Sequence, residues 1–116
     1  MDFEKLTAKS KEIIEQVLKL AAAHKNQYIT PLHLLKVLLD EKDSTIMNLI
    51  VKAGGNLTVI QDRLETAFAK LPQVAGAAVQ SLMSQDFTTV MMAAENLADK
   101  ANDQYVTVER LLQALA

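Results

Sequence analysis

The side chains in this sequence that could do chemistry are two histidines and several paired carboxylates. His24 and His33 could bind zinc only with two further ligands at suitable spacing, and the chain has no cysteine and no third histidine. No carboxylates are spaced to complete such a site. The sequence therefore predicts no metal site, and we interpret both histidines as ordinary surface or helix-end residues.

Carboxylates occur in pairs at helical spacing along the chain. The pairs are Glu12 with Glu15, Asp62 with Glu65, and Glu95 with Asp99. Acid–base catalysis by two carboxylates requires an apolar cleft that separates their pKa values. Each pair here has Lys, Arg or Gln neighbours on a polar stripe, so we interpret all three as solvated helix faces.

Motifs of nucleotide-binding and hydrolytic enzymes are missing as well. The sequence contains no G-x-x-x-x-G-K-[ST] phosphate loop and no G-x-S-x-G nucleophile motif. Gly54 and Gly55 are better interpreted as the end of a helix. We therefore predict no catalytic residue and no cofactor in this chain.

The composition favours one small helical domain. The 116 residues are half apolar but only 4% aromatic, with three Gly and two Pro, which is typical of closely packed helices with few tight hairpins. A net charge of −2 with interspersed signs argues against binding to nucleic acid or to an anionic membrane. The charged start lacks a secretory signal, no segment approaches the roughly 18 apolar residues that a bilayer requires, and the absence of Cys fits a reducing compartment. We expect a cytoplasmic protein.

A helix–connection–helix unit opens the chain. Thr7 is a candidate N-cap for a helix over about 8–24, whose apolar residues recur every three or four positions. After the short extended connection NQYI, Thr30 caps a second helix and Pro31 takes its first position, where the missing N–H costs nothing. This unit predicts two helices that pack through their apolar faces.

Two further helices and a linker follow. We expect the helices over about 44–53 and 59–71, the second of them capped by Asn56 or Thr58. Small residues without a clear period then predict a linker over about 73–83.

The last part of the chain repeats the opening unit. Ser84 is predicted to cap a helix whose apolar stripe begins at Phe87, and Thr107 to cap a short final helix. The segment NQYITPLHLLKVLL at 26–39 returns as DQYVTVERLLQALA at 103–116, 77 positions later. The same offset sets Thr7 against Ser84 without a gap, so we infer a duplicated unit.

The duplication sets the fold class that we predict, which is all-α with two pseudo-symmetric repeats packed on one core. Within the single domain 1–116, repeat one covers about 5–72 and the linker about 73–83. Repeat two begins at about 84 and is expected to be truncated at 116, because the two helices that complete repeat one have no counterparts after it.

The paired motifs ITPLHLL and VTVERLL, each preceded by an Ala-bearing amphipathic helix, resemble the Clp repeat. That repeat builds the N-terminal domain of Clp-type AAA+ unfoldases. LPQVAG at 71–76 and SQDF at 84–87 are most similar to the ClpB branch, the bacterial disaggregases. The resemblance covers essentially all 116 residues. It implies a mobile all-α domain above a hexameric ring, which binds exposed apolar segments of unfolded or aggregated proteins and hands them to the central pore.

The resemblance also implies what the chain does not do. ATP is expected to bind in downstream modules of a longer protein, so this piece binds clients but does not hydrolyse ATP. Its partners are expected to be unfolded or aggregated polypeptides and its own ring, and the isolated domain is expected to be monomeric. The alternative is the N-domain of a ClpA- or ClpC-type unfoldase, which docks adaptors or modified substrates for proteolysis.

The resemblance further places the client groove between the helix that starts near Thr7 and the helices around Met91 and Thr107. It implies a polar rim that includes Thr7, Asp103 and Glu109 above an apolar floor that includes Met91. The alternatives are structural: Thr7 caps its helix, Asp103 stabilises its turn, and Glu109 favours a helix N-terminus.

Two more residues are candidates for client contact. Arg110 stands where the ClpB pattern tends to have an apolar residue, which predicts a narrower or more polar groove. Met92 cannot share a core face with the adjacent Met91, and its counterpart in repeat one is Glu15. An exposed thioether adapts to varied apolar ligands, although a harmless surface Met is the alternative.

Overall fold

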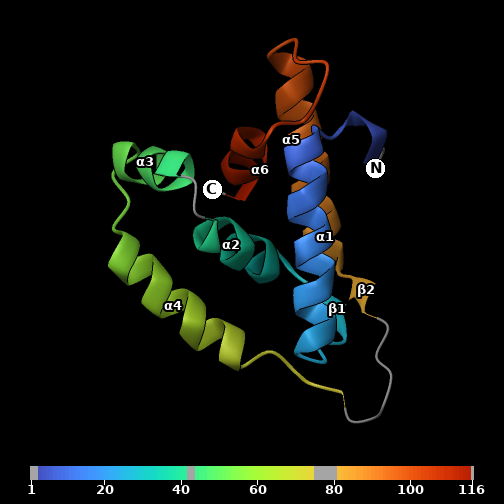
Figure 1. Cartoon of the computed structure of the whole chain (residues 1–116), viewed down its shortest axis with the longest axis vertical. Helices are drawn as coiled ribbons and strands as arrows, with labels where there is room; N and C mark the ends of the chain where they lie inside the picture. The colour runs from blue at the N-terminus through green and yellow to red at the C-terminus, as the bar shows by residue number, and fades with distance from the viewer. Residues whose placement is uncertain (1–2, 42–43, 75–80, 116) are drawn as a thin grey trace.

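Figure 1 shows the computed structural model of the chain, which describes residues 3–41, 44–74 and 81–115. The elements in chain order are η1 (Phe3–Lys5), α1 (Ala8–Ala23), β1 (Tyr28–Ile29), α2 (Pro31–Asp40), α3 (Ser44–Lys52), α4 (Leu57–Ala69), β2 (Leu82–Met83), α5 (Gln85–Lys100) and α6 (Val108–Leu115). The predicted all-α class is confirmed, with two short parallel strands in addition.

Both long helices begin at the predicted caps. Thr7 Oγ1 accepts a hydrogen bond from the N–H of Ser10 at 3.1 Å, and Ser84 Oγ accepts one from the N–H of Phe87 at 3.0 Å. Each bond satisfies one of the backbone donors that a helix start leaves free. Because the two caps are 77 positions apart, their matching geometry is consistent with the predicted duplication.

Two features complete or change the predicted connections. Asn56 is the residue that caps α4, since its Oδ1 accepts the N–H of Val59 at 3.2 Å. Leu82 and Met83, predicted as linker, instead form β2 and pair with β1. The linker residues 75–80 lie outside the described part of the chain, and the boundaries of the two repeats stay predictions.

Each helix pair is bound to the connection of the other. The N–H of Thr7 donates to the carbonyl of Val106 at 3.1 Å, and the N–H of Ser84 donates to the carbonyl of Ile29 at 3.0 Å. The offset of 77 relates these two bonds, and the flanking residues pair in parallel at both places. The start of each long helix is thereby fixed beside the start of the short helix in the opposite pair.

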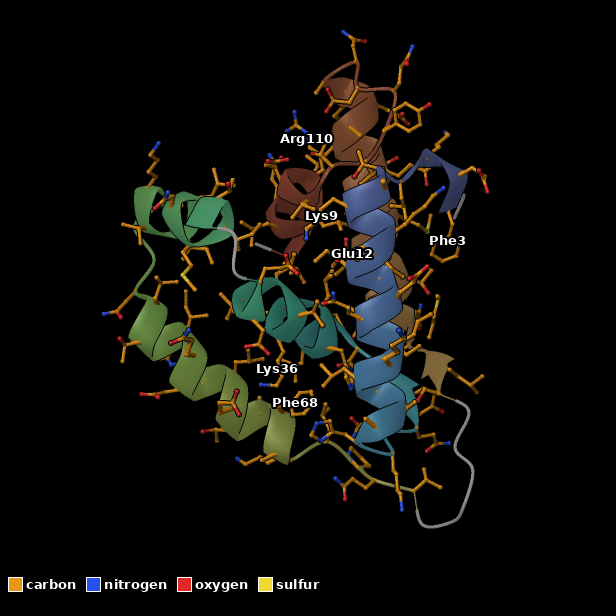
Figure 2. The ribbon with its side chains drawn as sticks, viewed as in Figure 1. Phe3, Lys9, Glu12, Lys36, Phe68 and Arg110 are labelled. Atoms are coloured by element: carbon orange, nitrogen blue, oxygen red, sulfur yellow. The ribbon has the colours of Figure 1, made fainter. Side chains whose placement is uncertain are left out.

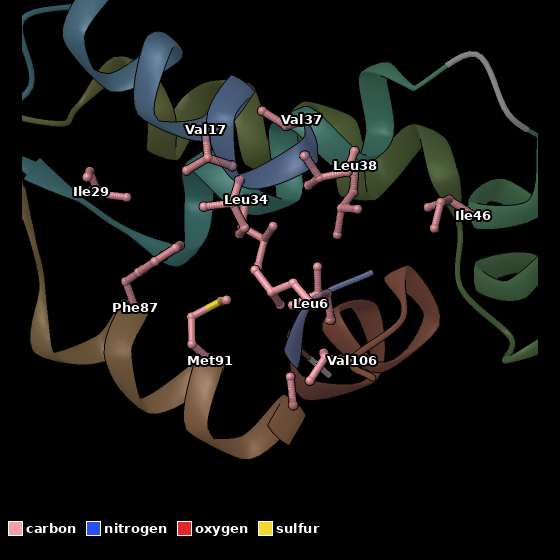
Figure 3. Packing of buried hydrophobic residues seen from close by; sticks show 14 of the residues in the cluster. Leu6, Val17, Ile29, Leu34, Val37, Leu38, Ile46, Phe87, Met91 and Val106 are labelled. Carbon is pink, nitrogen blue, oxygen red and sulfur yellow. The ribbon is translucent and has the colours of Figure 1, made fainter. Parts of the chain in front are cut away.

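The core lies between α1, α2, α5 and α6 (Figure 3). Its largest fully buried apolar side chains are Phe87, Ile13, Leu34, Leu38, Met91 and Leu111. The predicted stripe of the fifth helix is buried from Phe87 to Ala98. In α1, Ile13 and Val17 are fully buried, whereas Leu18 is 39% exposed at the edge of the helix.

The α3–α4 arm extends away from this core (Figure 1). Ile46 of α3 belongs to the core cluster, whereas α4 buries Leu64 and Phe68 among its described residues. Few buried side chains therefore hold α4 to the rest of the molecule.

Within residues 3–41, 44–74 and 81–115, three polar side chains are buried, those of Ser10, Asn26 and His33. His33 lies in the first turn of α2, as predicted, but a surface position is wrong because its side chain is 0% exposed. Its Nδ1 accepts the N–H of Thr30 at 2.9 Å and its Nε2 lies 2.9 Å from Oδ1 of Asn26. A buried imidazole is tolerated when both nitrogens have partners, and here they do.

Ser10 is the second buried polar residue with a structural role. Its hydroxyl receives a hydrogen bond from the Thr7 hydroxyl at 3.0 Å and donates to the carbonyl of Val106 at 2.9 Å. The first turn of α1 is thus bonded to the connection that precedes α6.

We expect Ser10→Ala to lower the free energy of unfolding by about 1–3 kcal/mol, because the substitution leaves a partly buried Thr7 hydroxyl without its acceptor and the Val106 carbonyl with one bond fewer. Urea unfolding followed by circular dichroism measures this change.

The matched control is Thr88→Ala, on the exposed face of α5. Its effect should stay within about 0.5 kcal/mol. Equal effects of the two substitutions would show that the buried network contributes nothing.

Candidate functional site

A hollow of about 190 Å³ opens where the starts of α1 and α6 meet the end of α2 and the start of α3; we call it the rim pocket. Its lining residues are Thr7, Lys9, Glu41, Thr45, Ile46, Thr107, Val108 and Glu109. The hydrogen bond from Thr7 to Val106 brings the two helix starts together at this place. Two of the predicted rim residues, Thr7 and Glu109, therefore line one hollow.

The hydroxyl of Thr7 is already engaged within the fold. It accepts the N–H of Ser10 and donates to the Ser10 side chain. The capping role of Thr7 is therefore established by the geometry, and only an unused lone pair of its oxygen remains for another molecule.

An ion pair closes one side of the rim pocket. Lys9 Nζ of α1 lies 2.8 Å from Oε2 of Glu41, which follows α2 (Figure 2 labels Lys9). The Glu41 side chain is only 14% exposed. Sequence reasoning missed this pair because the two residues are far apart along the chain and neither lies on an apolar stripe.

Glu109 lies in the first turn of α6 and is exposed. No hydrogen bond or ion pair of its side chain is found within the described residues. The positive end of the α6 dipole stabilises its negative charge at this position. Glu109 is therefore the rim carboxylate whose hydrogen-bonding capacity is still available.

The other predicted rim residue, Asp103, does not line the rim pocket. Its Oδ2 accepts a hydrogen bond from Nε of Arg110 at 3.1 Å, and both side chains are about one-third exposed. Arg110 also donates to Oε1 of Gln113 at 2.8 Å. Arg110, labelled in Figure 2, is therefore held by two partners, and the predicted narrowing of the groove at this residue stays a prediction.

A second and larger hollow of about 780 Å³ lies between α2, α6 and the α3–α4 arm; we call it the apolar hollow. Its lining residues are Pro31, Leu32, Leu35, Leu49, Ile50, Ala53, Gly55, Ile60, Glu109, Arg110, Leu112, Gln113 and Leu115. Glu109 lines both hollows, so the two open on either side of the first turn of α6.

The two candidate methionines lie outside both hollows. Met91 is 1% exposed and packs in the core, so its predicted place on a groove floor is corrected (Figure 3). Met92 is 54% exposed, as its position opposite the core face predicted. Ile46 and Val108, which sequence reasoning did not single out, provide apolar lining of the rim pocket instead.

A metal site and a membrane-spanning helix are two further features that a chain of this kind could carry. Within residues 3–41, 44–74 and 81–115, no group of three or more His, Asp or Glu side chains is placed to hold a metal ion. Over the same residues, no helix combines the length and apolar character needed to cross a membrane. The rim pocket and the apolar hollow are therefore the places that we consider for binding.

Comparison with known proteins gives a match over almost the whole chain. Residues 5–116 match the model of the Clp repeat N-terminal domain. The chain is 41% identical over 116 residues to the chaperone protein ClpB of Brucella suis biovar 1, a match that covers all of this chain and 13% of that protein. The chain thus spans about an eighth of the length of such relatives.

Solved structures share the fold at lower identity. The N-terminal domain of Hsp104 from Candida albicans superimposes with a TM-score of 0.84 at 21% identity, over 96% of this chain and 73% of that one. A complex of the ClpV N-domain with a VipB peptide gives a TM-score of 0.74 at 22% identity, over 96% of this chain and 67% of that one. At this identity the structures establish the fold alone.

We expect Glu41→Gln to destabilise the domain by about 1 kcal/mol at low salt, because the ion pair between Lys9 and Glu41 across the rim pocket is lost. The effect should shrink in 1 M NaCl, since salt screens the remaining charges. Thermal unfolding at the two salt concentrations measures both.

Glu12→Gln is the control for this substitution, because Glu12 lies 3.9 Å from the same lysine and is 56% exposed. It should change stability by less than about 0.3 kcal/mol. If both variants behave alike, the ion pair to Glu41 does not hold the wall of the pocket.

Proposed function

The chain belongs to the family of Clp repeat N-terminal domains, and we propose that it is the substrate-recognition domain of a ClpB-type chaperone. In this proposal it binds exposed apolar segments of unfolded or aggregated polypeptides and passes them to an ATP-driven ring. Its similarity to ClpB proteins over the whole chain supports the assignment.

The rim pocket is the observation that carries the proposal. Ile46 and Val108 contribute apolar lining, and Thr7, Thr107 and Glu109 contribute polar groups beside it. An apolar surface binds many sequences weakly, whereas a few polar groups bind the backbone of an extended chain. This combination suits clients that share no sequence. The solved complex of a ClpV N-domain with a peptide supports peptide binding on this fold.

Within this site, we assign the main polar contact to Glu109. Its carboxylate can accept hydrogen bonds from a client backbone or pair with a cationic client side chain. Asp103 and Arg110 extend the polar edge toward the end of α5, where their mutual bond leaves further donor and acceptor positions free. Thr7 contributes mainly by holding the start of α1 in place.

The remaining parts of the proposal concern the longer protein. We place ATP binding and hydrolysis in modules outside this chain, in a ring that is expected to be a hexamer in the cytoplasm. This domain then supplies binding and no chemistry, and it needs no cofactor of its own.

We expect Glu109→Gln to weaken binding of an unfolded polypeptide such as casein by about fivefold, because a charge-assisted hydrogen bond becomes a neutral one. Titration followed by ¹H–¹⁵N NMR measures the affinity. In the unsubstituted domain the shifts should cluster at Thr7, Val108 and Glu109.

Met92→Glu is the control, because Met92 is exposed but lies outside both hollows. Its affinity should be unchanged, and a loss of affinity would bring Met92 into the site. If the polypeptide saturates the domain without NMR shifts at the rim pocket, the proposal is wrong. Shifts that occur only with a folded adaptor protein would favour a ClpA- or ClpC-type role.

A further inference from the structure

A buried imidazole in the first turn of α2 connects the segment between α1 and α2 with the end of α4. His33 Nδ1 accepts the N–H of Thr30, and Nε2 lies 2.9 Å from Oδ1 of Asn26. Because Nδ1 faces a donor, the ring is neutral and Nε2 carries the proton that is donated to Asn26. Asn26 Nδ2 in turn donates to the carbonyl of Pro72, just after α4, at 3.2 Å. The ring of Phe68, near the end of α4, meets the imidazole edge-on at a centroid distance of 5.3 Å.

We propose that His33, Asn26 and Pro72 form a pH-sensitive latch, which fastens the end of α4 to the first helix pair and opens when His33 is protonated.

The closed latch has no good place for a second proton. That proton would have to bind Nδ1, which faces the N–H of Thr30. The Thr30 hydroxyl, also 2.9 Å from Nδ1, can accept it, but the backbone N–H then loses its acceptor and a cation lies in the core. Burial accordingly lowers the pKa of His33 below its ordinary value. The imidazolium is more stable once the ring reaches water.

The charged groups around the ring do not compensate for this cost. His24, at the end of α1, meets the Phe68 ring at a centroid distance of 5.0 Å and adds a like charge in acid. Lys36 of α2 lies 5.6 Å from the centre of the same ring and binds Glu65 of α4 at 2.9 Å. Among the described residues, no carboxylate lies within ion-pair distance of His33.

Besides the latch, α4 is held by the ion pair of Glu65 with Lys36, and the residues after it by the N–H of Val74, which donates to the carbonyl of Lys25 at 2.7 Å. α4 buries Leu64 and Phe68 among its described residues, so its local stability is expected to be low. Opening of the latch removes the edge contact between Phe68 and His33 and the tie at Pro72. Because Ile60 of α4 lines the apolar hollow, movement of α4 widens that hollow and exposes more apolar surface. Acid is thereby coupled to the amount of apolar surface that the domain presents.

The second helix pair carries a counterpart that cannot respond in this way. Asp103 and Arg110 occupy the positions that correspond to Asn26 and His33 at the offset of 77, and they form the equivalent bond at 3.1 Å. Arginine keeps its proton throughout the physiological range. The proposed switch is therefore confined to the first pair.

The test combines histidine NMR with hydrogen exchange of the α4 amides between pH 7.5 and 5. We expect the His33 ring to be the neutral Nε2–H tautomer at pH 7.5 and to titrate below about 6.5. Because the exposed ring binds its proton more tightly than the closed one, the ratio of open to closed molecules should rise by up to about tenfold per pH unit below 6.5, until the closed state also protonates. Protection factors in α4 should fall by the same factor, and fluorescence of the dye ANS should rise.

Two variants make the test specific. His33→Gln keeps an acceptor for the Thr30 N–H and an amide donor for Asn26 but does not titrate, so α4 protection should become independent of pH. His24→Gln removes the exposed histidine together with its edge contact to Phe68, so the level of α4 protection can change but its dependence on pH should remain.

Several results would contradict the proposal of a pH-sensitive latch. These are titration of His33 at or above pH 6.5 in the folded domain, α4 protection that does not change with pH, and a pH response that persists in His33→Gln or vanishes in His24→Gln. If His33→Gln does not fold, the His33 titration and the α4 protection of the unsubstituted domain still decide the question.

Discussion

The N–H groups of Thr7 and Ser84 each donate to a carbonyl in the connection of the opposite helix pair, at 3.1 and 3.0 Å. These donors belong to the caps of α1 and α5, so the same residues start the long helices and join the two pairs. At these places the first connection has two strand residues, Tyr28 and Ile29, and the second has the single bridge residue Val106, so neither is an extended strand by itself. The cross-pairing brings the starts of α1 and α6 together, and the rim pocket exists only because they meet.

Equivalent positions in the two helix pairs keep one geometry with different chemistry. Asn26 and His33 form a neutral bond at 2.9 Å, whereas Asp103 and Arg110 form a charged one at 3.1 Å. The side chains of Asn26 and His33 are buried, and the His33 ring contacts Phe68 of α4. The side chains of Asp103 and Arg110 are about one-third exposed. A buried ion pair loses more hydration than its attraction returns, so the neutral pair suits the covered position and the charged pair the open one.

Helix starts and helix faces could be predicted because they depend on residues close in sequence, and the caps at Thr7 and Ser84 are the clearest cases. The depth at which a side chain is buried could not be predicted from the sequence. The period placed Met91 on the apolar face correctly, but a period does not distinguish a core from a groove floor, and Met91 lies in the core. The burial of His33 was missed because its partner Asn26 lies across the connection between α1 and α2. A signal for it existed: at the same offset the second pair has an acid and a base, which indicates that these two positions touch.

Thr7 and Asp103 already make hydrogen bonds that stabilise the fold, which limits what they can offer to another molecule. The Thr7 hydroxyl accepts one hydrogen bond and donates another inside the fold, and the Asp103 carboxylate is shared with Arg110. A client that competed for these groups would weaken the cap and the turn that shape the site. Glu109 has no such role among the described residues, and it faces both the rim pocket and the apolar hollow. Under the proposed function, recognition that leaves the fold intact would use the available carboxylate of Glu109 together with apolar surface on either side of it.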